Sequence, residues 1–355
     1  MVKKEILLFL GAGASTPFGK PTTTSLLENF RKKIPHSEGS ELLRKLTDCG
    51  FNDFEELLQA LLDLKGTLNS PYLGKFFRNW KERLFLANSF HDRWKRYSDG
   101  WWNDNGKNFI NMEPLFDNID ESITILEDVV IDKYSWNDDF NPILDNVYKP
   151  IFSFLKENSN SLKIVTTNYD RAIENYCENN FMNYFDGFKH ISGHYWWTGE
   201  FHYPNQLDYD SVILYKLHGS LNWKKRKDGK IIRGVGEARP QDKRYTENIL
   251  IYPSLDIKNY KVAPYDGIKG EFVKSFNECE LCIIIGSSFR DQQINTVLKD
   301  KKKKIIVISP TVEKDIESNL FNAEKHSDFK YLKSIPQALS EQTVNSILKE
   351  IERNL

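Results

Sequence analysis

Small and polar residues follow five apolar segments of the chain, at the point where each segment ends. The five groups are Gly11-Ala12-Gly13-Ala14-Ser15, Thr166-Thr167-Asn168-Tyr169-Asp170, His218-Gly219-Ser220, Gly286-Ser287-Ser288 and Ser309-Pro310. They supply backbone N–H groups, an amide, hydroxyls, a carboxylate and an imidazole, which together can bind a nucleotide and transfer a proton. In an open parallel sheet, ligands bind outside the carboxyl ends of the strands. If the five segments are strands of one sheet, their polar ends predict a nucleotide site.

The five segments have the pattern of strands buried on both faces of a parallel sheet. Each is short and mostly apolar, and they cover residues 6–10, 162–168, 211–217, 281–285 and 304–308. Helical spacing of apolar residues follows at 171–178 and 341–355, and residues 25–28 (Ser-Leu-Leu-Glu) fit a capping box that begins another helix. The Asp228-Gly229 pair predicts a hairpin, and Ile249–Pro253 predicts a short strand. The expected fold class is α/β, with a Rossmann-like parallel sheet and flanking helices.

A large helical insertion is expected between the first strand–helix unit and the rest of the sheet. From residue 36 to residue 159, apolar residues recur at helical spacing, as in 54–62, 119–130 and 143–155. We therefore assign residues 1–35 and 160–355 to the Rossmann-like domain and residues 36–159 to the insertion.

Each polar group also has a structural explanation. The glycine-rich turn can bring N–H groups to a phosphate, or it can be only a tight strand-to-helix turn. It lacks the third glycine of the dinucleotide fingerprint, which disfavours an ordinary dehydrogenase. Asn168 and Asp170 can cap the following helix, and His218 can be a satisfied structural side chain. The coincidence of five polar strand ends favours a nucleotide site over these structural explanations.

Composition excludes several classes of protein. The 355 residues carry a formal net charge of −1, which argues against a protein that coats nucleic acid or an anionic membrane. Four cysteines do not make a disulfide framework, and no apolar run approaches the ~18 residues of a membrane span. Cys279 and Cys282 have the spacing of metal ligands, but no second pair completes a zinc site. We expect a globular protein of the cytoplasm that binds no metal ion, zinc included.

The ordered motifs resemble those of the bacterial sirtuin-like (SIR2-like) domain. They are Gly-Ala-Gly-Ala-Ser at 11–15, Thr-Asn-Tyr-Asp at 167–170, Leu-His-Gly-Ser at 217–220 and Gly-Ser-Ser-Phe at 286–289, with Asp291 and Asn295 after them. The resemblance covers residues 5–20 and about 160–312, and it implies a Rossmann-like sheet that binds NAD.

Two departures from the resemblance concern protein deacylation. Deacylating sirtuins carry a Gly-Ile-Pro-Asp-Phe-Arg loop after the glycine turn, whereas this chain has Phe18-Gly19-Lys20-Pro21 followed by three threonines. They also carry two Cys-x-x-Cys pairs, which four cysteines at these positions do not form. The departures leave the branch of the family that hydrolyses NAD, several members of which serve in defence against phage.

The resemblance also implies a role for each polar residue. Asn168 would position the ribose and the attacking water, and His218 would be the general base, since its ordinary pKa is near ~6.5. Asp170 would accept a hydrogen bond from the carboxamide. The residues expected to contact NAD are Gly11, Ala12, Gly13, Ala14, Ser15, Thr167, Asp170, Gly286, Ser287, Ser288 and Ser309.

The sequence thus predicts an NAD+ hydrolase that releases nicotinamide and ADP-ribose, as the effector of anti-phage defence by NAD depletion. The alternatives are an NAD-dependent deacylase or ADP-ribosyltransferase and a non-catalytic module that senses NAD derivatives. Because an unregulated hydrolase would kill its own cell, we expect control by homo-oligomerisation or by a partner such as a HerA-type ATPase. Direct binding of nucleic acid or membrane is not expected.

Overall fold

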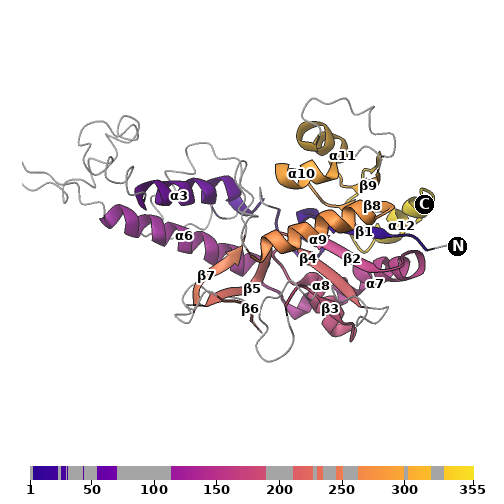
Figure 1. Cartoon of the computed structure of the whole chain (residues 1–355), viewed down its shortest axis with the longest axis horizontal. Helices are drawn as coiled ribbons and strands as arrows, with labels where there is room; N and C mark the ends of the chain where they lie inside the picture. The colour runs from indigo at the N-terminus through magenta and orange to yellow at the C-terminus, as the bar shows by residue number, and fades with distance from the viewer. Residues whose placement is uncertain are drawn as a thin grey trace, which may run out of the picture. The chain divides into compact units, whose positions relative to one another are not determined.

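The computed structural model describes most of the chain (Figure 1). The described residues are 3–22, 25–28, 30, 43, 54–69, 113–188, 211–226, 230–234, 245–250, 263–299, 303–320 and 332–355. Contacts divide the chain into two compact units. One comprises Met1–Leu26 and Asp128–Leu355, and the other comprises Leu27–Glu127.

A seven-stranded parallel sheet, counted over the described residues, forms the centre of the first unit. Its strands are β1 (Ile6–Leu10), β2 (Leu162–Thr166), β3 (Tyr184–Phe185), β4 (Val212–Lys216), β8 (Leu281–Ile285), β9 (Lys304–Ile308) and β10 (Leu332–Ile335). Their order across the sheet is β10-β9-β8-β1-β2-β4-β3. The five strands expected from the sequence are therefore confirmed, and they are consecutive neighbours. A parallel sheet flanked by helices is the predicted fold class.

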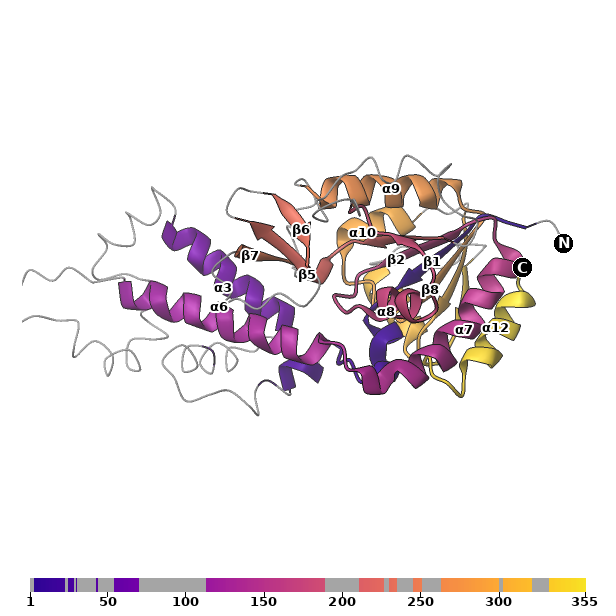
Figure 2. The ribbon, with the colours of Figure 1, turned by 90° about the horizontal axis from the view of Figure 1, so that it is seen from below.

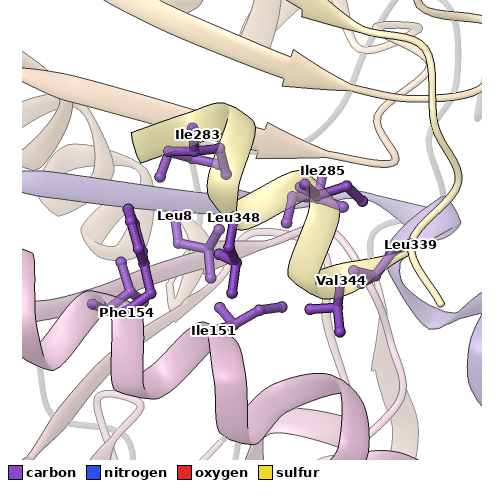
Figure 3. A pocket seen from close by; sticks show the side chains of 11 residues that line it. Leu8, Ile151, Phe154, Ile283, Ile285, Leu339, Val344 and Leu348 are labelled. Carbon is purple, nitrogen blue, oxygen red and sulfur yellow. The ribbon is translucent and has the colours of Figure 1, made fainter. Parts of the chain in front are cut away.

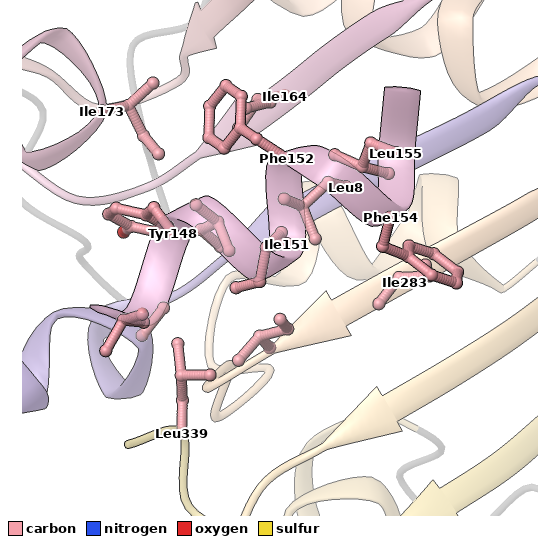
Figure 4. Packing of buried hydrophobic residues seen from close by; sticks show 14 of the residues in the cluster. Leu8, Tyr148, Ile151, Phe152, Phe154, Leu155, Ile164, Ile173, Ile283 and Leu339 are labelled. Carbon is pink, nitrogen blue, oxygen red and sulfur yellow. The ribbon is translucent and has the colours of Figure 1, made fainter. Parts of the chain in front are cut away.

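Helices cover both faces of this sheet (Figure 2). They are η1 (Ala12–Phe18), η2 (Asp138–Phe140), α7 (Asn141–Asn158), α8 (Ala172–Asn179), α9 (Tyr265–Glu278), α10 (Gln292–Leu298), α11 (Val312–Asp315), the π-helical turn η5 (Ile316–Leu320) and α12 (Val344–Glu352). Alternate residues of β1 enter two different cores. Leu8 packs with α7 and α12, as Figure 4 shows for α7, whereas Leu7 and Phe9 pack with α9. This double burial explains why the strand is apolar at every position.

Helix α7 belongs to the sheet unit, which differs from the expected boundary at residue 159. Its apolar stripe, including Val147, Ile151 and Leu155, is buried in the core that β1 and β2 form. The helical spacing predicted a helix here, as observed. Periodicity shows which face of a helix is apolar but not which partner covers it, so the domain assignment differed.

The second unit contains α3 (Phe54–Asn69) and the first part of α6 (Glu113–Tyr134), which ends in the sheet unit. Leu57, Leu58 and Leu61 of α3 are buried, as are Ile119 and Leu126 of α6. The helical spacing at 54–62 and 119–130 is thus confirmed. The rest of the expected insertion, from 36 to 42, from 44 to 53 and from 70 to 112, lies outside the described residues.

A small antiparallel sheet follows β4 almost directly. It consists of β5 (Gly219–Arg226), β6 (Ile231–Arg233) and β7 (Tyr245–Leu250), in the order β6-β5-β7 among the described residues. The predicted hairpin is present, since the Arg226 N–H donates to the Lys230 carbonyl at 2.9 Å. Asp228 and Gly229 of its turn and residues 251–253 of the predicted short strand lie outside the described residues.

An apolar pocket lies beneath the C-terminal helix (Figure 3). Leu8, Ile283 and Ile285 of the sheet line it together with Ile151 of α7 and Leu348 of α12. Every lining side chain is apolar, so the pocket offers a nucleotide no hydrogen-bonding side chain. None of the described helices combines the length and the apolar character needed to cross a membrane.

Three glycines bring the loops after β1 and β8 into backbone contact. The Gly11 N–H donates to the Ile285 carbonyl and the Gly13 N–H donates to the Gly286 carbonyl, each at 2.9 Å. A Cβ on Gly286 would lie 2.4 Å from the Ala14 nitrogen, and its φ of +68° is in the left-handed region. A Cβ on Gly11 would lie 2.6 Å from the Gly286 oxygen. Side chains at these positions would separate the loops, because real Cβ atoms do not approach backbone so closely.

We expect Gly286→Ala to lower the free energy of unfolding by roughly 3 kcal/mol, because the left-handed conformation and the close contact both oppose a Cβ. The measurement is urea unfolding of the full chain. Gly270→Ala is the matched control: a Cβ on this exposed glycine of α9 meets nothing within 4 Å. It should raise stability by about 0.5–1 kcal/mol. Equal unfolding midpoints for Gly286→Ala and the wild type would show that the loops are not in contact.

Candidate functional site

The five polar strand ends lie in spatial order along the carboxyl edge of the sheet. Across β9, β8, β1, β2 and β4 they are Ser309, Gly286–Ser288, Gly11–Ser15, Thr167–Asp170 and His218. The chain proceeds from β1 to β2 and β4 on one side, and it returns to β8 and β9 on the other side. The boundary between β1 and β8 is therefore the topological switch point, where doubly wound sheets bind their ligands.

Asn168 joins the ends of β1 and β2. Its Nδ2 donates to the Gly11 carbonyl at 2.9 Å and to the Ser15 Oγ at 2.8 Å, and the residue is buried. Its backbone N–H donates to the Thr166 Oγ1 at 3.0 Å. The neighbouring Thr167 N–H donates to the Leu10 carbonyl at 3.1 Å. These bonds hold the amide in one orientation against the glycine turn.

Asp170 has one bonded and one unbonded carboxylate oxygen. Oδ1 accepts from the Ala172 N–H at 3.0 Å, at the start of α8, whose N-cap residue is Arg171. Oδ2 is buried and has no hydrogen-bond partner in the structure. An unsatisfied buried oxygen is costly. Oδ2 is therefore an acceptor that the described residues leave unsatisfied.

A buried ion pair lies behind Asp170. The Lys216 Nζ is 2.8 Å from the Glu174 Oε1 and also donates to the Asp170 carbonyl at 2.5 Å, and both charged side chains are almost fully buried. Burial, together with the negative charges of Asp170 and Glu174, raises the pKa of Tyr148 well above its ordinary value. Our sequence reasoning missed Lys216 and Glu174. The available signal was a lysine at the end of an otherwise buried strand, which needs a partner.

His218 is paired with a carboxylate from across the switch point. Its Nε2 lies 3.1 Å from the Asp291 Oδ2, and both side chains are buried. The Asp291 Oδ1 caps α10 by accepting from the N–H groups of Gln293 and Ile294. The Tyr169 ring lies 6.4 Å from the His218 ring, between centroids. The sequence placed Asp291 in a motif but gave it no role.

The glycine-rich turn uses most of its N–H groups internally. Gly11 donates to Ile285 at the end of β8 and Gly13 donates to Gly286 in the loop after it, while Ala14, which is buried, donates to the Gly11 carbonyl at 2.9 Å. The Ala14 bond is that of a tight turn, whereas Gly11 and Gly13 bond to a different segment of the chain. Ala12 stands between them as the first residue of η1.

Ser287, Ser288 and Ser309 follow the two strands on the other side of the switch point. The Ser287 Oγ accepts from the Phe289 N–H, and the Ser288 carbonyl accepts from the Asn319 side chain. The Ser309 Oγ donates to Asp315 at 3.2 Å. The strand order places all three serines near the carboxyl edge of the sheet. Their described hydrogen bonds are to other residues of the protein.

The segment after η1 is fixed by aromatic side chains. The buried Lys20 donates to the Ser135 carbonyl, and its ammonium lies 5.6 Å from the Trp136 ring centroid and 5.4 Å from that of Phe140. The Tyr134 hydroxyl donates to the Pro21 carbonyl at 2.9 Å. The segment that departs from the deacylase motif therefore has a structural role in this chain.

The described cysteines are buried free thiols. Burial raises the pKa of Cys279 to about 11 and that of Cys282 well above its ordinary value. Within the described ranges, no three histidine, cysteine or acidic side chains gather as possible metal ligands. The thiols therefore contribute to packing.

Residues 162–312 match the family model described as the SIR2-like domain. Among solved structures, a triply substituted Sir2 homologue with 2′-O-acetyl ADP-ribose is 12% identical, with a TM-score of 0.43, covering 99% of this chain and 93% of its own. A Sir2 with NAD+ and a p53 peptide is 12% identical, with a TM-score of 0.38 and coverages of 98% and 93%. No curated protein matches the chain. The family match extends from the start of β2 to the first residue of α11.

We expect Lys216→Met to lower the free energy of unfolding by about 3–5 kcal/mol, because it leaves Glu174 buried without its cation. Urea unfolding of Lys216→Met, Glu174→Gln and the double variant gives the coupling free energy between the two side chains. The double variant should lose less stability than the sum of the single variants. Arg353→Gln is the control, since its pair with Glu350 is exposed and should be worth under ~1 kcal/mol. If the stability losses of the two single variants simply add in the double variant, the result would contradict an ion pair between Lys216 and Glu174.

The thiols of Cys279 and Cys282 should react with iodoacetamide at pH 8 at least about a hundredfold more slowly in the native chain than in urea. Only the thiolate reacts, and pH 8 is far below the raised pKa of Cys279, about 11. Mass spectrometry of the labelled peptides gives the two rates. Similar native and unfolded rates would contradict the burial of these side chains.

Proposed function

We propose that the chain is an NAD+ hydrolase that cleaves the bond between nicotinamide and ribose and releases nicotinamide and ADP-ribose. One observation carries this proposal. Three buried polar side chains, Asn168, Asp170 and His218, lie at neighbouring strand ends beside the switch point of a sirtuin-like domain. The three provide an amide, an acceptor and a base, which is what the reaction needs.

The chemistry of the leaving group limits what the site must supply. Cleavage passes through an oxocarbenium-like state, as in other glycosidic hydrolyses. The bond to the pyridinium nitrogen breaks with its electron pair, so nicotinamide leaves as a neutral molecule and needs no acid. The remaining tasks are to hold the two halves of the substrate and to deprotonate water.

Asp170 would hold the nicotinamide end. Its Oδ2 is a buried acceptor without a partner, and a carboxamide offers two N–H donors. Lys216 fixes the carbonyl of the same residue, and the Oδ1 bond to Ala172 fixes the carboxylate. Binding a donor at Oδ2 would remove the cost of leaving this oxygen unsatisfied.

Asn168 would orient the ribose and the water. Because its Nδ2 is committed to Gly11 and Ser15, the amide presents Oδ1 as the acceptor for a hydroxyl or a water. His218 would take the proton of the water as its oxygen bonds to the ribose carbon. The products are nicotinamide, ADP-ribose and one proton, so atoms and charges balance. A ribose hydroxyl in place of water would give a cyclised product.

The phosphates and the adenosine would lie along β1, β8 and β9. Gly11, Gly13 and Ala14 use their N–H groups within the protein, which leaves the Ala12 N–H in this turn for a phosphate oxygen. Ser287 and Ser288 would continue the contact on the β8 loop, with Ser309 at the adenosine end.

The cellular role we propose is defence against phage by depletion of cytoplasmic NAD. Such an enzyme must be restrained until infection. Homo-oligomerisation or a partner such as a HerA-type ATPase would supply the restraint, and the unit Leu27–Glu127 is a candidate surface for it.

Asn168→Ala should lower the kcat for nicotinamide release by at least ~100-fold, because the variant loses the group that orients ribose and water. Affinity for NAD+ should change by less than about tenfold, since Asp170 and the β8 loop remain. The measurements are nicotinamide release over a range of protein concentrations and calorimetric binding of NAD+. Asn146→Ala, an exposed asparagine of α7, is the matched control and should behave as the wild type.

Binding of NAD+ without release at any protein concentration would contradict a self-sufficient hydrolase and favour the sensing module. Transfer of ADP-ribose or removal of an acyl group from an added protein, in place of release to water, would favour the deacylase and transferase alternative.

A further inference from the structure

The carboxylate of Asp170 is buried and has no cationic partner among the residues that the structure describes. The residue is 4% exposed, and its Oδ2 makes no hydrogen bond. Its Oδ1 accepts from the neutral Ala172 N–H. A buried carboxylate without a cation costs stability, because burial removes the water that would otherwise solvate its charge.

The acidic side chains that follow Asp170 along α8 are paired with cations. Glu174, in the first turn, lies 2.8 Å from the Lys216 Nζ. Glu178 lies 2.9 Å from the Arg171 guanidinium. Three carboxylates and two cations leave one negative charge on this group of residues. Because the other two carboxylates have partners, that charge belongs to Asp170.

Lys216 is held so that its ammonium is balanced by Glu174 and not by the Asp170 carboxylate. The Nζ donates to the Glu174 Oε1 at 2.8 Å and to the backbone carbonyl of Asp170 at 2.5 Å. The side chains of Lys216 and Glu174 are only 1% and 2% exposed. The Ser220 Oγ, 3.5 Å from the Glu174 Oε1, adds a neutral donor. Lys216 therefore fixes the backbone of Asp170 without pairing with its charge.

The negative charges of Asp170 and Glu174 act on a neighbouring side chain. Burial and, after it, these two charges raise the pKa of the Tyr148 hydroxyl well above its ordinary value. The two charges thus disfavour a further anion nearby, and the same Coulomb interaction favours a cation.

The nicotinamide ring of NAD+ is a cation, whereas the ring of NADH is neutral because it carries an added hydride. Both forms carry the same carboxamide, so a hydrogen bond to the Asp170 Oδ2 is open to both and does not distinguish them. A buried negative charge does distinguish them, because it attracts the cationic ring and acts strongly where water is excluded.

We propose that Glu174 is a specificity-determining residue of the nicotinamide subsite. By balancing Lys216 it leaves the Asp170 carboxylate as the counter-ion of the substrate, so that the subsite prefers the cationic ring of NAD+ to the neutral ring of NADH. This inference rests on the proposed function, because it takes the nicotinamide end of the substrate to lie at Asp170. Glu174 and Lys216 act through Asp170 and are assigned no contact with the substrate.

The test is the ratio of the dissociation constants of NADH and NAD+, measured by calorimetry with the full chain at pH 7. We expect the wild type to bind NAD+ at least about tenfold more tightly than NADH. Glu174→Gln keeps an acceptor for Lys216 but removes the balancing charge, so the ratio should fall at least about fivefold. Asp170→Asn removes the counter-ion itself and should bring the ratio close to about one.

Variants of Lys216 separate the effect of charge from a loss of structure. Lys216→Met combined with Glu174→Gln removes both charges and should restore the wild-type ratio within about twofold. Lys216→Met alone leaves two carboxylates, so the ratio should rise above that of the wild type. If Glu174→Gln does not fold, Lys216→Met decides, and an equal or lower ratio would overturn the proposal. A pair that only stabilises the fold predicts equal losses of NAD+ and NADH affinity in each single variant, which would also overturn it.

Glu350→Gln is the matched control for the removal of a paired carboxylate. Glu350 lies 3.0 Å from the exposed Arg353, and the ratio should stay within about twofold of the wild type because solvent and salt screen this pair. Equal affinities of the wild type for the two dinucleotides would overturn the proposal. If the wild type shows the expected ratio but releases no nicotinamide, the proposed function fails, whereas the charge selectivity stands.

Discussion

The backbone contact between the loops after β1 and β8 is the constraint on which the site depends. Gly11 and Gly13 meet Gly286 so closely that a Cβ on any of the three would overlap backbone atoms. The contact closes the switch point and fixes the distance between the two halves of the sheet edge. Asn168 is bonded to the Gly11 carbonyl, so its position depends on this contact. The Asp291 carboxylate also depends on it, since its helix follows the Gly286 loop.

Two buried charged pairs set the chemistry around this contact. Lys216 and Glu174 hold the Asp170 backbone on the β2 side, and Asp291 holds His218 from the β8 side. Neither pair is an efficient way to stabilise a fold, because desolvation offsets much of the attraction. Their effect is on orientation: one fixes the backbone of Asp170 and the other fixes the ring of His218. Asp170 Oδ2 is left unsatisfied among the described residues, which costs stability.

The sequence was sufficient to find the strands and the polar ends of the strands, because both signals are local. An apolar run such as 6–10, bounded by glycine, can be recognised without its neighbours. The partners of His218 and Asp170 were not predictable in the same way. Asp291 is 73 residues from His218, and Lys216 is 42 residues from Glu174. Their pairing follows from the strand order, which puts β4 beside β2 and β8 beside β1. The glycine turn shows the same limit, since its composition fits both a phosphate contact and a contact with another loop.

The strand order also determines when the site can exist during synthesis. β1 is made before both of its neighbours, and one of them, β8, begins only at residue 281. Until that point the growing chain has Asn168, Asp170 and His218 but neither the Gly286 loop nor Asp291. A ribosome-bound fragment therefore lacks half of the edge on which NAD+ would lie. The topology of the sheet therefore delays the assembly of this edge until β8 has been made.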